Sequence, residues 1–239
     1  MNNIFIHIGA RADSSGLKNK NLLKFNGKPL ILWSILLAKK INKQAKIIIN
    51  TDSDKIINLA KKQNIDYILK RPKSLSGNKA SKFSAWKYAC EYLHNYKLID
   101  SQDLFLDLDC TCPLRKLSDL KDLVDKFFQL RNKKKFDAIF TITEARRNPY
   151  FNIMEKKNNY MKISKKLKKN IVRRQNAPKV YEHCGVGYAL KPNFILKKNN
   201  FLEGRLIGHE VPLITGLDID SKLDFKILEL LKKYEKRFN

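Results

Sequence analysis

The chain alternates short apolar runs with segments in which apolar residues recur every three or four positions. The apolar runs cover residues 3–9, 46–50, 66–69, 103–108 and 137–143, and their length and β-branched content predict buried strands. The periodic segments cover residues 29–40, 54–63, 80–93 and 117–130 and predict amphipathic helices. Thr51-Asp52-Ser53 supplies capping residues for the second of these helices. Strands that alternate with helices in this way predict an α/β fold with three layers, α/β/α, around a mainly parallel sheet.

The alternation stops between residues 144 and 185, a stretch rich in basic and polar residues. We interpret this stretch as an excursion from the sheet, built as a hairpin arm. The α/β pattern resumes over residues 186–190 and ends in an amphipathic helix from residue 221 to about residue 236. Since no linker separates these parts, we expect residues 1–239 to form a single domain that carries residues 144–185 as an insertion.

Composition narrows the class of protein. Of the 239 residues, 43% are hydrophobic, which is enough for a core, and no apolar run reaches the roughly 20 residues of a membrane span. Four cysteines do not make a disulfide framework, and the first residues do not resemble a signal peptide, so we expect a cytoplasmic globular protein without a membrane partner.

The formal net charge of +26 suggests polyanions as partners. However, the basic residues fall mostly on predicted helix surfaces, and the chain has no RNA-binding signature with interleaved aromatic residues. We therefore favour a compositional origin for most of this charge and expect no specific nucleic-acid partner.

Polar loops follow the predicted strands, where ligands bind in sheets of this kind. In the loop of residues 10–21, small residues allow backbone N–H groups to face a phosphate, and Arg11 and Lys20 can neutralise it. The loop matches neither of the common glycine-rich phosphate motifs, and an ordinary basic loop explains it as well.

Two acidic pairs with a spacing of two also follow apolar runs. Asp218 and Asp220 lie on one side of an extended segment, which suits Mg²⁺ that carries substrate phosphates. The alternative is that Asp220 or Ser221 only caps the final helix, and both readings stay open. Asp107 and Asp109 likewise share a face, so one can be buried while the other reaches a ligand.

Other candidate residues carry less information one by one. Cys110 and Cys112 lack the partners of a zinc site and are expected to be partly buried thiols. The four histidines do not cluster, and we assign none of them a catalytic role. Arg146-Arg147 and Arg173-Arg174-Gln175 bracket the excursion and can bind carboxylate or phosphate, although solvated surface charge is the simpler explanation for each. Together, these groups indicate metal-assisted chemistry on a nucleotide and an acidic partner.

Several motifs in order resemble those of the acylneuraminate cytidylyltransferase family, which makes CMP-sialic acid and related CMP-sugars. The matching segments run along nearly the whole chain: Ala10-Arg11…Gly16…Lys20-Asn21, Asn26-Gly27-Lys28-Pro29-Leu30-Ile31, Arg71-Pro72…Leu75…Ala80-Ser81, Thr111-Cys112-Pro113-Leu114-Arg115, Arg173-Arg174-Gln175-Asn176-Ala177-Pro178, Gly185-Val186-Gly187-Tyr188 and Asp218-Ile219-Asp220…Leu223-Asp224.

The resemblance implies that CTP and a nine-carbon keto-sugar acid react with the help of Mg²⁺ to give a CMP-sugar and pyrophosphate. It implies that Arg11, Lys20, Asp218 and Asp220 are catalytic, with Asp218 and Asp220 as the metal ligands. It places CTP on Ala10, Arg11, Ser14, Gly16, Lys20, Asn21, Arg71, Ala80 and Ser81. It places the sugar acid on Asp109, Thr111, Arg146, Arg174, Gln175 and Tyr181. It also implies that residues 144–185 are a dimerisation arm, and hence a homodimer.

The chain departs from the family pattern at a few positions. Ser15 replaces a lysine, Asn78 an aspartate, and Lys82 a small hydroxyl residue, while Asp109 stands where a glutamine is expected. The last departure, with Arg146 to Asn152, resembles the branch that handles legionaminic-type sugars. Three alternatives stay open: a 3-deoxy-octulosonate cytidylyltransferase, a basic nucleic-acid-binding module, and a family member that binds nucleotide without turnover.

Overall fold

The computed structural model describes residues 3–12, 16–77, 80–168 and 171–234. In these residues the strands are β1 (Ile4–Gly9), β2 (Lys24–Phe25), β3 (Lys28–Pro29), β4 (Lys46–Thr51), β5 (Tyr67–Lys70), β6 (Leu104–Asp107), β7 (Ala138–Glu144), β8 (Met154–Lys157), β9 (Tyr160–Ile163), β10 (Tyr181–Leu190) and β11 (Leu206–Glu210). The helices are α1 (Leu30–Ile41), α2 (Asp54–Lys61), α3 (Lys82–Asn95), α4 (Leu117–Leu130), α5 (Pro192–Lys197), α6 (Leu213–Gly216) and α7 (Lys222–Lys233).

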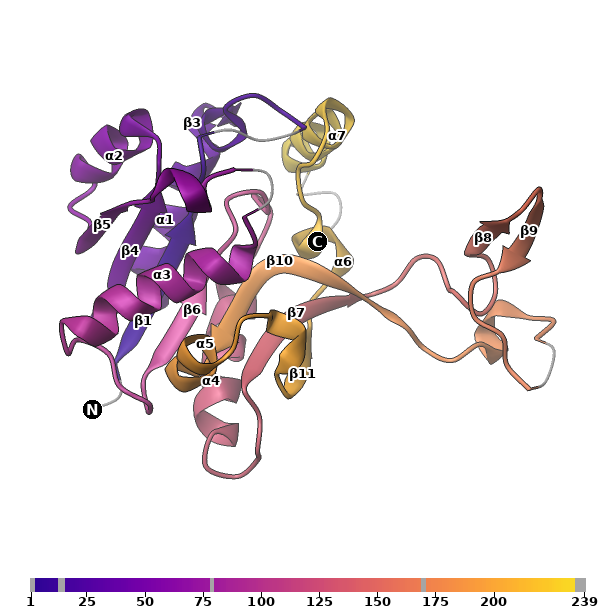
Figure 1. The fold of residues 1–239 in the computed structure, drawn as a ribbon. Helices are drawn as coiled ribbons and strands as arrows, with labels where there is room; N and C mark the ends of the chain where they lie inside the picture. Colours follow the sequence, from indigo (N-terminus) through magenta and orange to yellow (C-terminus); the bar gives the residue numbers. More distant parts are fainter. Residues whose placement is uncertain (1–2, 13–15, 78–79, 169–170, 235–239) are drawn as a thin grey trace.

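The main sheet has the strand order β11-β7-β10-β6-β1-β4-β5 (Figure 1). Every neighbouring pair in it is parallel except the two pairs that involve β10, which runs antiparallel to β6 and β7. The prediction of a mainly parallel α/β/α fold is confirmed. Within the described residues, no helix combines the length and the apolar character that crossing a membrane requires.

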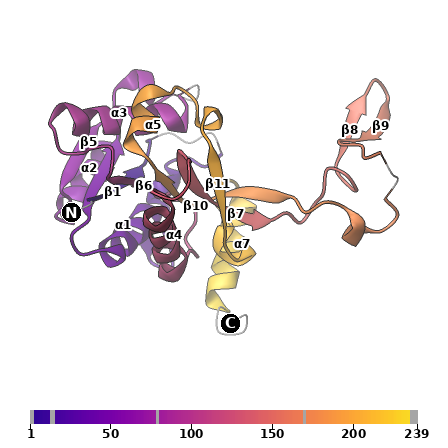
Figure 2. The same cartoon turned by 90° about the horizontal axis from the view of Figure 1, so that it is seen from below.

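The alternation of side chains along β1 explains the three layers. Ile4, Ile6 and Ile8 pack into one apolar cluster with α1, α2 and α4, whereas Phe5 packs into a second cluster with α3 and α5 on the opposite face. Figure 2 shows the sheet between these two sets of helices. A third, smaller cluster joins Leu17 of the first loop to Ile219 and to Leu228 of α7, so the C-terminal helix is packed against the N-terminal loop.

Local capping fixes where several helices begin. The Ser53 hydroxyl accepts a hydrogen bond from Ile56 N at the start of α2, as its sequence predicts, and Ser81 does the same for α3. At α7, Ser221 and Asp224 form a reciprocal capping box. The cap of the last helix is therefore Ser221, and the Asp220 carboxylate is left for other contacts.

The long strand β10 begins at Tyr181, five residues earlier than the sequence pattern indicates, and its pairing with β7 shifts between His183 and Tyr188. Thr141 of β7 stabilises this irregularity. Its buried hydroxyl contacts Cys184 O at 2.9 Å and Gly187 O at 3.1 Å, and it accepts a hydrogen bond from Gly187 N. The irregular stretch brings Gly185 beneath the Asp109 side chain, where a Cβ atom would lie 2.5 Å from Asp109 Oδ2.

The predicted excursion leaves the sheet at the end of β7 and returns in β10. It extends away from the main body and carries the β8–β9 hairpin (Figures 1 and 2). Large apolar side chains on it are exposed, among them Tyr160 (74%), Met161 (56%) and Val172 (85%). This arm therefore does not bury these apolar side chains against its own chain.

Candidate functional site

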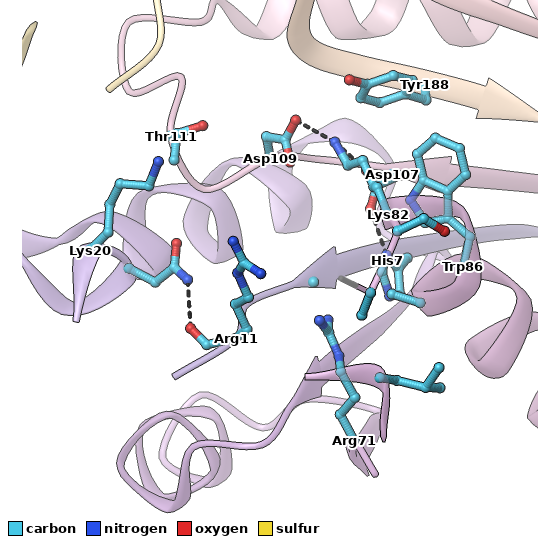
Figure 3. Close-up of a pocket in the computed structure, with 16 residues that line it drawn as sticks. His7, Arg11, Lys20, Arg71, Lys82, Trp86, Asp107, Asp109, Thr111 and Tyr188 are labelled. Carbon is cyan, nitrogen blue, oxygen red and sulfur yellow. Dashed lines mark hydrogen bonds and ion pairs between the residues drawn. The ribbon is translucent and has the colours of Figure 1, made fainter. Parts of the chain in front are cut away.

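A pocket opens where the carboxyl ends of β1, β4, β5 and β6 meet. Its volume is about 410 Å³. The lining residues are His7, Gly9, Arg11, Lys20, Asn21, Arg71, Leu75, Ala80, Ser81, Lys82, Ala85, Trp86, Asp107, Asp109, Thr111 and Tyr188 (Figure 3). Arg11, Lys20 and Arg71 lie on one side of the pocket, and Lys82 lies on the other side with the acidic and aromatic side chains.

Arg71, immediately after β5, is the most firmly held of the cations. Its Nε donates to Asn50 Oδ1 at 3.1 Å, and its NH2 group donates to Asn50 O at 2.8 Å. Burial lowers the pKa of Arg71, an effect that Asp52 and Asp107 oppose, and an arginine stays charged under such conditions. Arg11, one residue past Ala10, lies on the same side of the pocket. Two guanidinium groups there suit an anionic or carbonyl-rich ligand.

Lys20 joins the first loop to the C-terminal acidic segment. Its Nζ donates to Ile219 O at 2.8 Å and pairs with Asp220 Oδ1 at 3.0 Å. Gly16 approaches the same segment so closely that a Cβ atom there would lie 2.3 Å from Asp220 O. Ile219 N in turn donates to Thr111 O at 3.0 Å. Residues some 200 positions apart thus meet at the mouth of the pocket.

The Asp218–Asp220 pair has the character of a partial metal site. Ile219 is fully buried, so alternation leaves both carboxylates on the opposite, exposed side of the segment. Loss of solvation, followed by repulsion from Asp220, raises the pKa of Asp218. No cluster of three or more metal-ligating side chains occurs among the described residues. Two carboxylates without a third protein ligand fit Mg²⁺, which takes its other ligands from substrate phosphates and water.

The acidic side of the pocket is organised around Lys82, the first residue of α3. Its Nζ pairs with Asp109 Oδ2 and, at 3.2 Å, with Asp107 Oδ2, and it lies 4.0 Å from the centre of the Tyr188 ring. Burial alone would lower the pKa of Lys82, but the carboxylates of Asp109 and Asp107 outweigh it and raise this pKa. Burial likewise opposes the charge on Asp107, yet Lys82 and the His7 hydrogen bond lower its pKa to about 2. Each ionised group is therefore kept charged by its neighbours.

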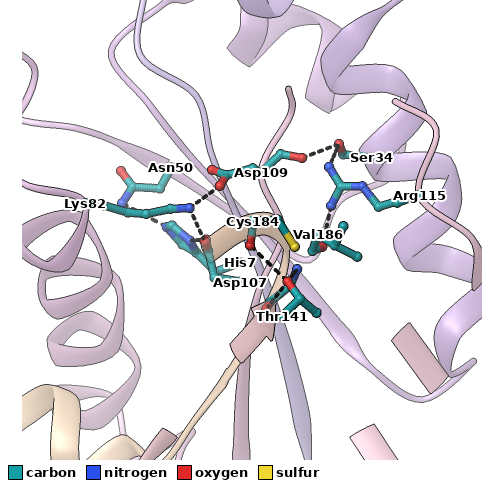
Figure 4. A network of polar contacts seen from close by, with 11 residues as sticks. His7, Ser34, Asn50, Lys82, Asp107, Asp109, Arg115, Thr141, Cys184 and Val186 are labelled. Atoms are coloured by element: carbon teal, nitrogen blue, oxygen red, sulfur yellow. Dashed lines mark hydrogen bonds and ion pairs between the residues drawn. The ribbon is translucent and has the colours of Figure 1, made fainter. Parts of the chain in front are cut away.

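A buried chain of hydrogen bonds runs from Arg71 through Asn50 and His7 to Asp107, and Figure 4 shows the last three of these residues. His7 Nδ1 lies 2.5 Å from Asp107 Oδ1, and His7 Nε2 lies 3.2 Å from Asn50 Nδ2. Because Asn50 Oδ1 accepts from Arg71, its Nδ2 must be the donor toward His7. The imidazole therefore accepts at Nε2 and donates from Nδ1 to Asp107, which is the neutral tautomer.

Most of the residues predicted to bind nucleotide lie together. Arg11, Lys20, Asn21, Arg71, Ala80 and Ser81 line the pocket. Ala10 is buried behind it, with its N–H donating to Asn50 O, and Gly16 lies against Asp220. Ser14 falls outside the described residues, as do Ser15 and Asn78.

The predicted sugar-binding residues separate into two groups. Asp109 and Thr111 line the pocket. Arg174 and Gln175 instead line a hollow of about 400 Å³ on the arm, together with Asn148. Arg146 and Tyr181 are exposed where the arm joins the sheet. A single chain thus does not bring the arm residues to the pocket.

Sequence reasoning did not place four polar or aromatic residues in the pocket, namely His7, Lys82, Trp86 and Tyr188, and it left open whether Asp107 is buried or reaches a ligand. The available signal was a polar residue inside an apolar run, since His7, Asn50 and Asp107 each interrupt a buried strand. Their grouping depends on register, because His7 is paired with Asp107 and with Ile48 across two neighbouring strands. That register cannot be obtained from one strand alone.

Residues 5–201 match the family model described as cytidylyltransferase. The chain belongs to the cytidylyltransferase family. It is 35% identical over 235 residues to post-translational flagellin modification protein B of Campylobacter coli, covering 98% of this chain and 96% of that protein. It is also 35% identical over 239 residues to CMP-N,N'-diacetyllegionaminic acid synthase of Campylobacter jejuni, covering 97% and 95% respectively.

Among solved structures, the fold of this cytidylyltransferase resembles that of a CMP:2-keto-3-deoxy-manno-octonic acid synthetase complexed with CTP. The TM-score is 0.68 at 18% sequence identity, with 98% of this chain and 99% of the other covered. The resemblance to the family that the sequence motifs indicated is confirmed, and so is its three-layer architecture.

Proposed function

We propose that this cytidylyltransferase transfers a cytidylyl group from CTP to a nonulosonic acid of the legionaminic type. The anomeric oxygen of the sugar acid forms a bond to the α-phosphorus of CTP. The bond from that phosphorus to the bridging oxygen breaks, pyrophosphate leaves with the electron pair, and the hydroxyl proton passes to solvent. The observation that carries the proposal is the contact of Lys20 with Asp220 at the mouth of the pocket. It unites the cationic loop and the acidic pair that a metal-assisted phosphoryl transfer requires.

In this proposal the chain's own residues bind and orient rather than react. Arg11 and Lys20 stabilise the charge that develops on the phosphates. Asn21, Arg71, Ala80 and Ser81 hold ribose and base, and Ala10, Ser14 and Gly16 belong to the first loop, which also binds CTP. Asp218 and Asp220 would hold Mg²⁺, which supplies charge neutralisation at the phosphates, and the raised pKa of Asp218 supports a cation between them.

The sugar acid is proposed to bind between Asp109 and Thr111 of one chain and Arg146, Arg174, Gln175 and Tyr181 of a second copy. Two features support a homodimer: the arm residues lie away from their own pocket, and the arm exposes apolar side chains such as Val172. We place the reaction in the cytoplasm, where CTP is available.

The activity is tested with purified protein, CTP, Mg²⁺ and a panel of legionaminic, neuraminic, pseudaminic and octulosonic acids. Mass spectrometry of the CMP-sugar and release of pyrophosphate are the readouts. We expect the largest kcat/KM with a legionaminic acid. Turnover with the octulosonic acid alone would contradict the proposed substrate class. Affinity for nucleic acid without any turnover would contradict the proposed enzymatic activity.

The shared site is tested by complementation between two inactive chains that carry different tags and are co-expressed. One chain carries Asp220→Asn and the other carries Arg174→Ala. If the arm serves the partner's pocket, the mixed dimer has one intact site, and a random mixture recovers about a quarter of the wild-type activity. If the arm serves its own chain, mixing restores nothing.

A further inference from the structure

Two positions at which the sequence departs from its family pattern, residues 82 and 109, are in direct contact in the structure. The Lys82 ammonium pairs with Asp109 Oδ2, and the Asp109 main-chain oxygen accepts a hydrogen bond from Ser34 Oγ at 3.2 Å (Figure 4). Gly185 leaves the room that the carboxylate occupies. Asp109 is therefore fixed from three directions, by α3, α1 and β10.

The Lys82 ammonium interacts with three neighbouring side chains. An ammonium has three N–H groups. The Lys82 Nζ donates to Asp109 Oδ2, forms an ion pair with Asp107 Oδ2 at 3.2 Å, and lies 4.0 Å from the centre of the Tyr188 ring. Because the hydrogen bond that Lys82 donates goes to Asp109, Lys82 serves to position this carboxylate.

One carboxylate oxygen of Asp109 has no hydrogen-bond donor among the described residues. Oδ2 is taken by Lys82, while Oδ1 receives no hydrogen bond from any described residue, and 26% of the side chain is exposed in the pocket. An N–H or O–H group of a ligand that reaches Oδ1 therefore meets an acceptor without a competing donor among the described residues.

The position of Asp109 places this acceptor near the reacting centre. Thr111, two residues further on, accepts the hydrogen bond of Ile219 N, between the two proposed metal ligands. The charge of Asp109 also acts on Asp218. The nucleotide-binding cations lie on the other side of the pocket, so the group that meets Asp109 belongs to the attacking sugar acid.

We propose that Lys82 and Asp109 form a specificity-determining unit for the sugar acid. Lys82 positions Asp109, and Asp109 Oδ1 accepts a hydrogen bond from an N–H or O–H substituent of the acid, such as an acylamino group. This inference rests on the proposed function for the identity of the acid, but the coupling of the two side chains is independent of it.

The coupling is tested first, by a double-mutant cycle of urea unfolding with Lys82→Met, Asp109→Asn and the double variant. We expect each single change to raise the equilibrium constant for unfolding strongly, and we expect this constant for the double variant to be at least tenfold lower than additivity predicts, because neither charge of the Lys82–Asp109 pair is then left unpaired. If the effects of the two single changes on the free energy of unfolding are additive, the proposed coupling of Lys82 with Asp109 is wrong. This readout needs no turnover.

Specificity is tested by steady-state kinetics and, with a non-hydrolysable CTP analogue present, by calorimetric binding of the sugar acid. We expect Lys82→Met and Asp109→Asn to raise the KM and Kd of the sugar acid at least tenfold and the KM of CTP less than threefold. Lys82→Arg should recover part of the loss. Lys87→Met, the same change further along α3, is the control, since Lys87 contacts Lys198 O and Asn199 instead.

A second set of sugar acids identifies the substituent that donates a hydrogen bond to Asp109. Sugar acids that carry acetamido, hydroxyl or hydrogen at one carbon are compared, and wild type should disfavour the deoxy compound while Asp109→Asn should discriminate less. Equal loss of CTP and sugar affinity in the variants, or unchanged discrimination, would overturn the assignment to the sugar. If wild type binds the acids but yields no CMP-sugar, the proposed function fails while the binding comparison still decides the inference.

Discussion

Replacing Gly16 by alanine directly tests the contact between the N-terminal loop and the C-terminal acidic segment. A Cβ atom at this position would lie 2.3 Å from the main-chain oxygen of Asp220. Carbon and oxygen that are not bonded stay roughly 3.3 Å or more apart, so Gly16→Ala must separate the two backbones by about 1 Å. Both partners are backbone, and no side-chain rotation can relieve the overlap.

The separation acts on the two groups that the proposed reaction requires together. Lys20 and Asp220 form an ion pair at 3.0 Å, and a shift of about 1 Å removes it and displaces Asp220 from the phosphates. A misplacement of that size costs on the order of 100-fold in rate, or ~2.7 kcal/mol. We therefore expect kcat/KM for CTP to fall about 100-fold.

The assay is pyrophosphate release at several Mg²⁺ concentrations, accompanied by a thermal melt of the same preparation. Gly77→Ala is the matched control, because a Cβ atom at Gly77 meets no heavy atom within 4 Å. If Gly16→Ala retains activity within threefold of wild type with an unchanged dependence on Mg²⁺, the reasoning from this contact is wrong.

Three further predictions follow from single side chains. Asp220→Asn should lower kcat by at least about 100-fold by removing one carboxylate from the proposed metal pair; because the side chain is 75% exposed, circular dichroism and melting temperature should stay close to wild type, and near-normal turnover would refute its role. Thr141→Val should reduce the free energy of unfolding by about 1–3 kcal/mol, measured with urea, because it leaves buried polar groups of β10 without their partner; an unchanged midpoint would contradict this. The pKa of Asp107 is lowered to about 2 in the folded protein, so its ionised carboxylate contributes stability that is full above the unfolded pKa of roughly 3.9 and is lost as the pH falls through 2. This contribution is on the order of 2 kcal/mol, so the free energy of unfolding, measured between pH 6 and pH 2, should depend less on pH in Asp107→Asn than in wild type. Parallel pH dependences of the two proteins would contradict this contribution.

The order of elements could be predicted because the signals are local. The period of apolar residues distinguishes strands from helices, and a serine before an apolar periodic segment fixes where α2 begins. The same local logic located the polar loops after β1, β5 and β6 and the acidic pair near the C-terminus. Arg11 and Lys20 were found in this way, whereas Asn21, Arg71, Ala80 and Ser81 were assigned through the resemblance to the family.

The acidic side of the pocket was decided by tertiary structure. His7 and Asp107 are separated by 100 residues, and Lys82 and Asp109 by 27, so no local pattern in the sequence connects the members of either pair. Only the placement of β6 beside β1, with α3 above them, turns these residues into one network. The residue that caps the last helix was decided likewise, since Ser221 completes the cap with Asp224 and the Asp220 carboxylate pairs with Lys20.

The sequence by itself therefore determined the α/β alternation, the presence of an excursion after residue 144 and the loops that carry cations, because each depends on neighbours a few positions apart. The return of the chain into the sheet at Tyr181 was decided by the pairing of β10 with β7. Tertiary structure decided which polar groups are buried together, which carboxylate stays available to a ligand and how far the arm extends from its own pocket. The physical reason is that burial and charge pairing depend on distances in space, and strand order and register set those distances between residues that no periodicity connects.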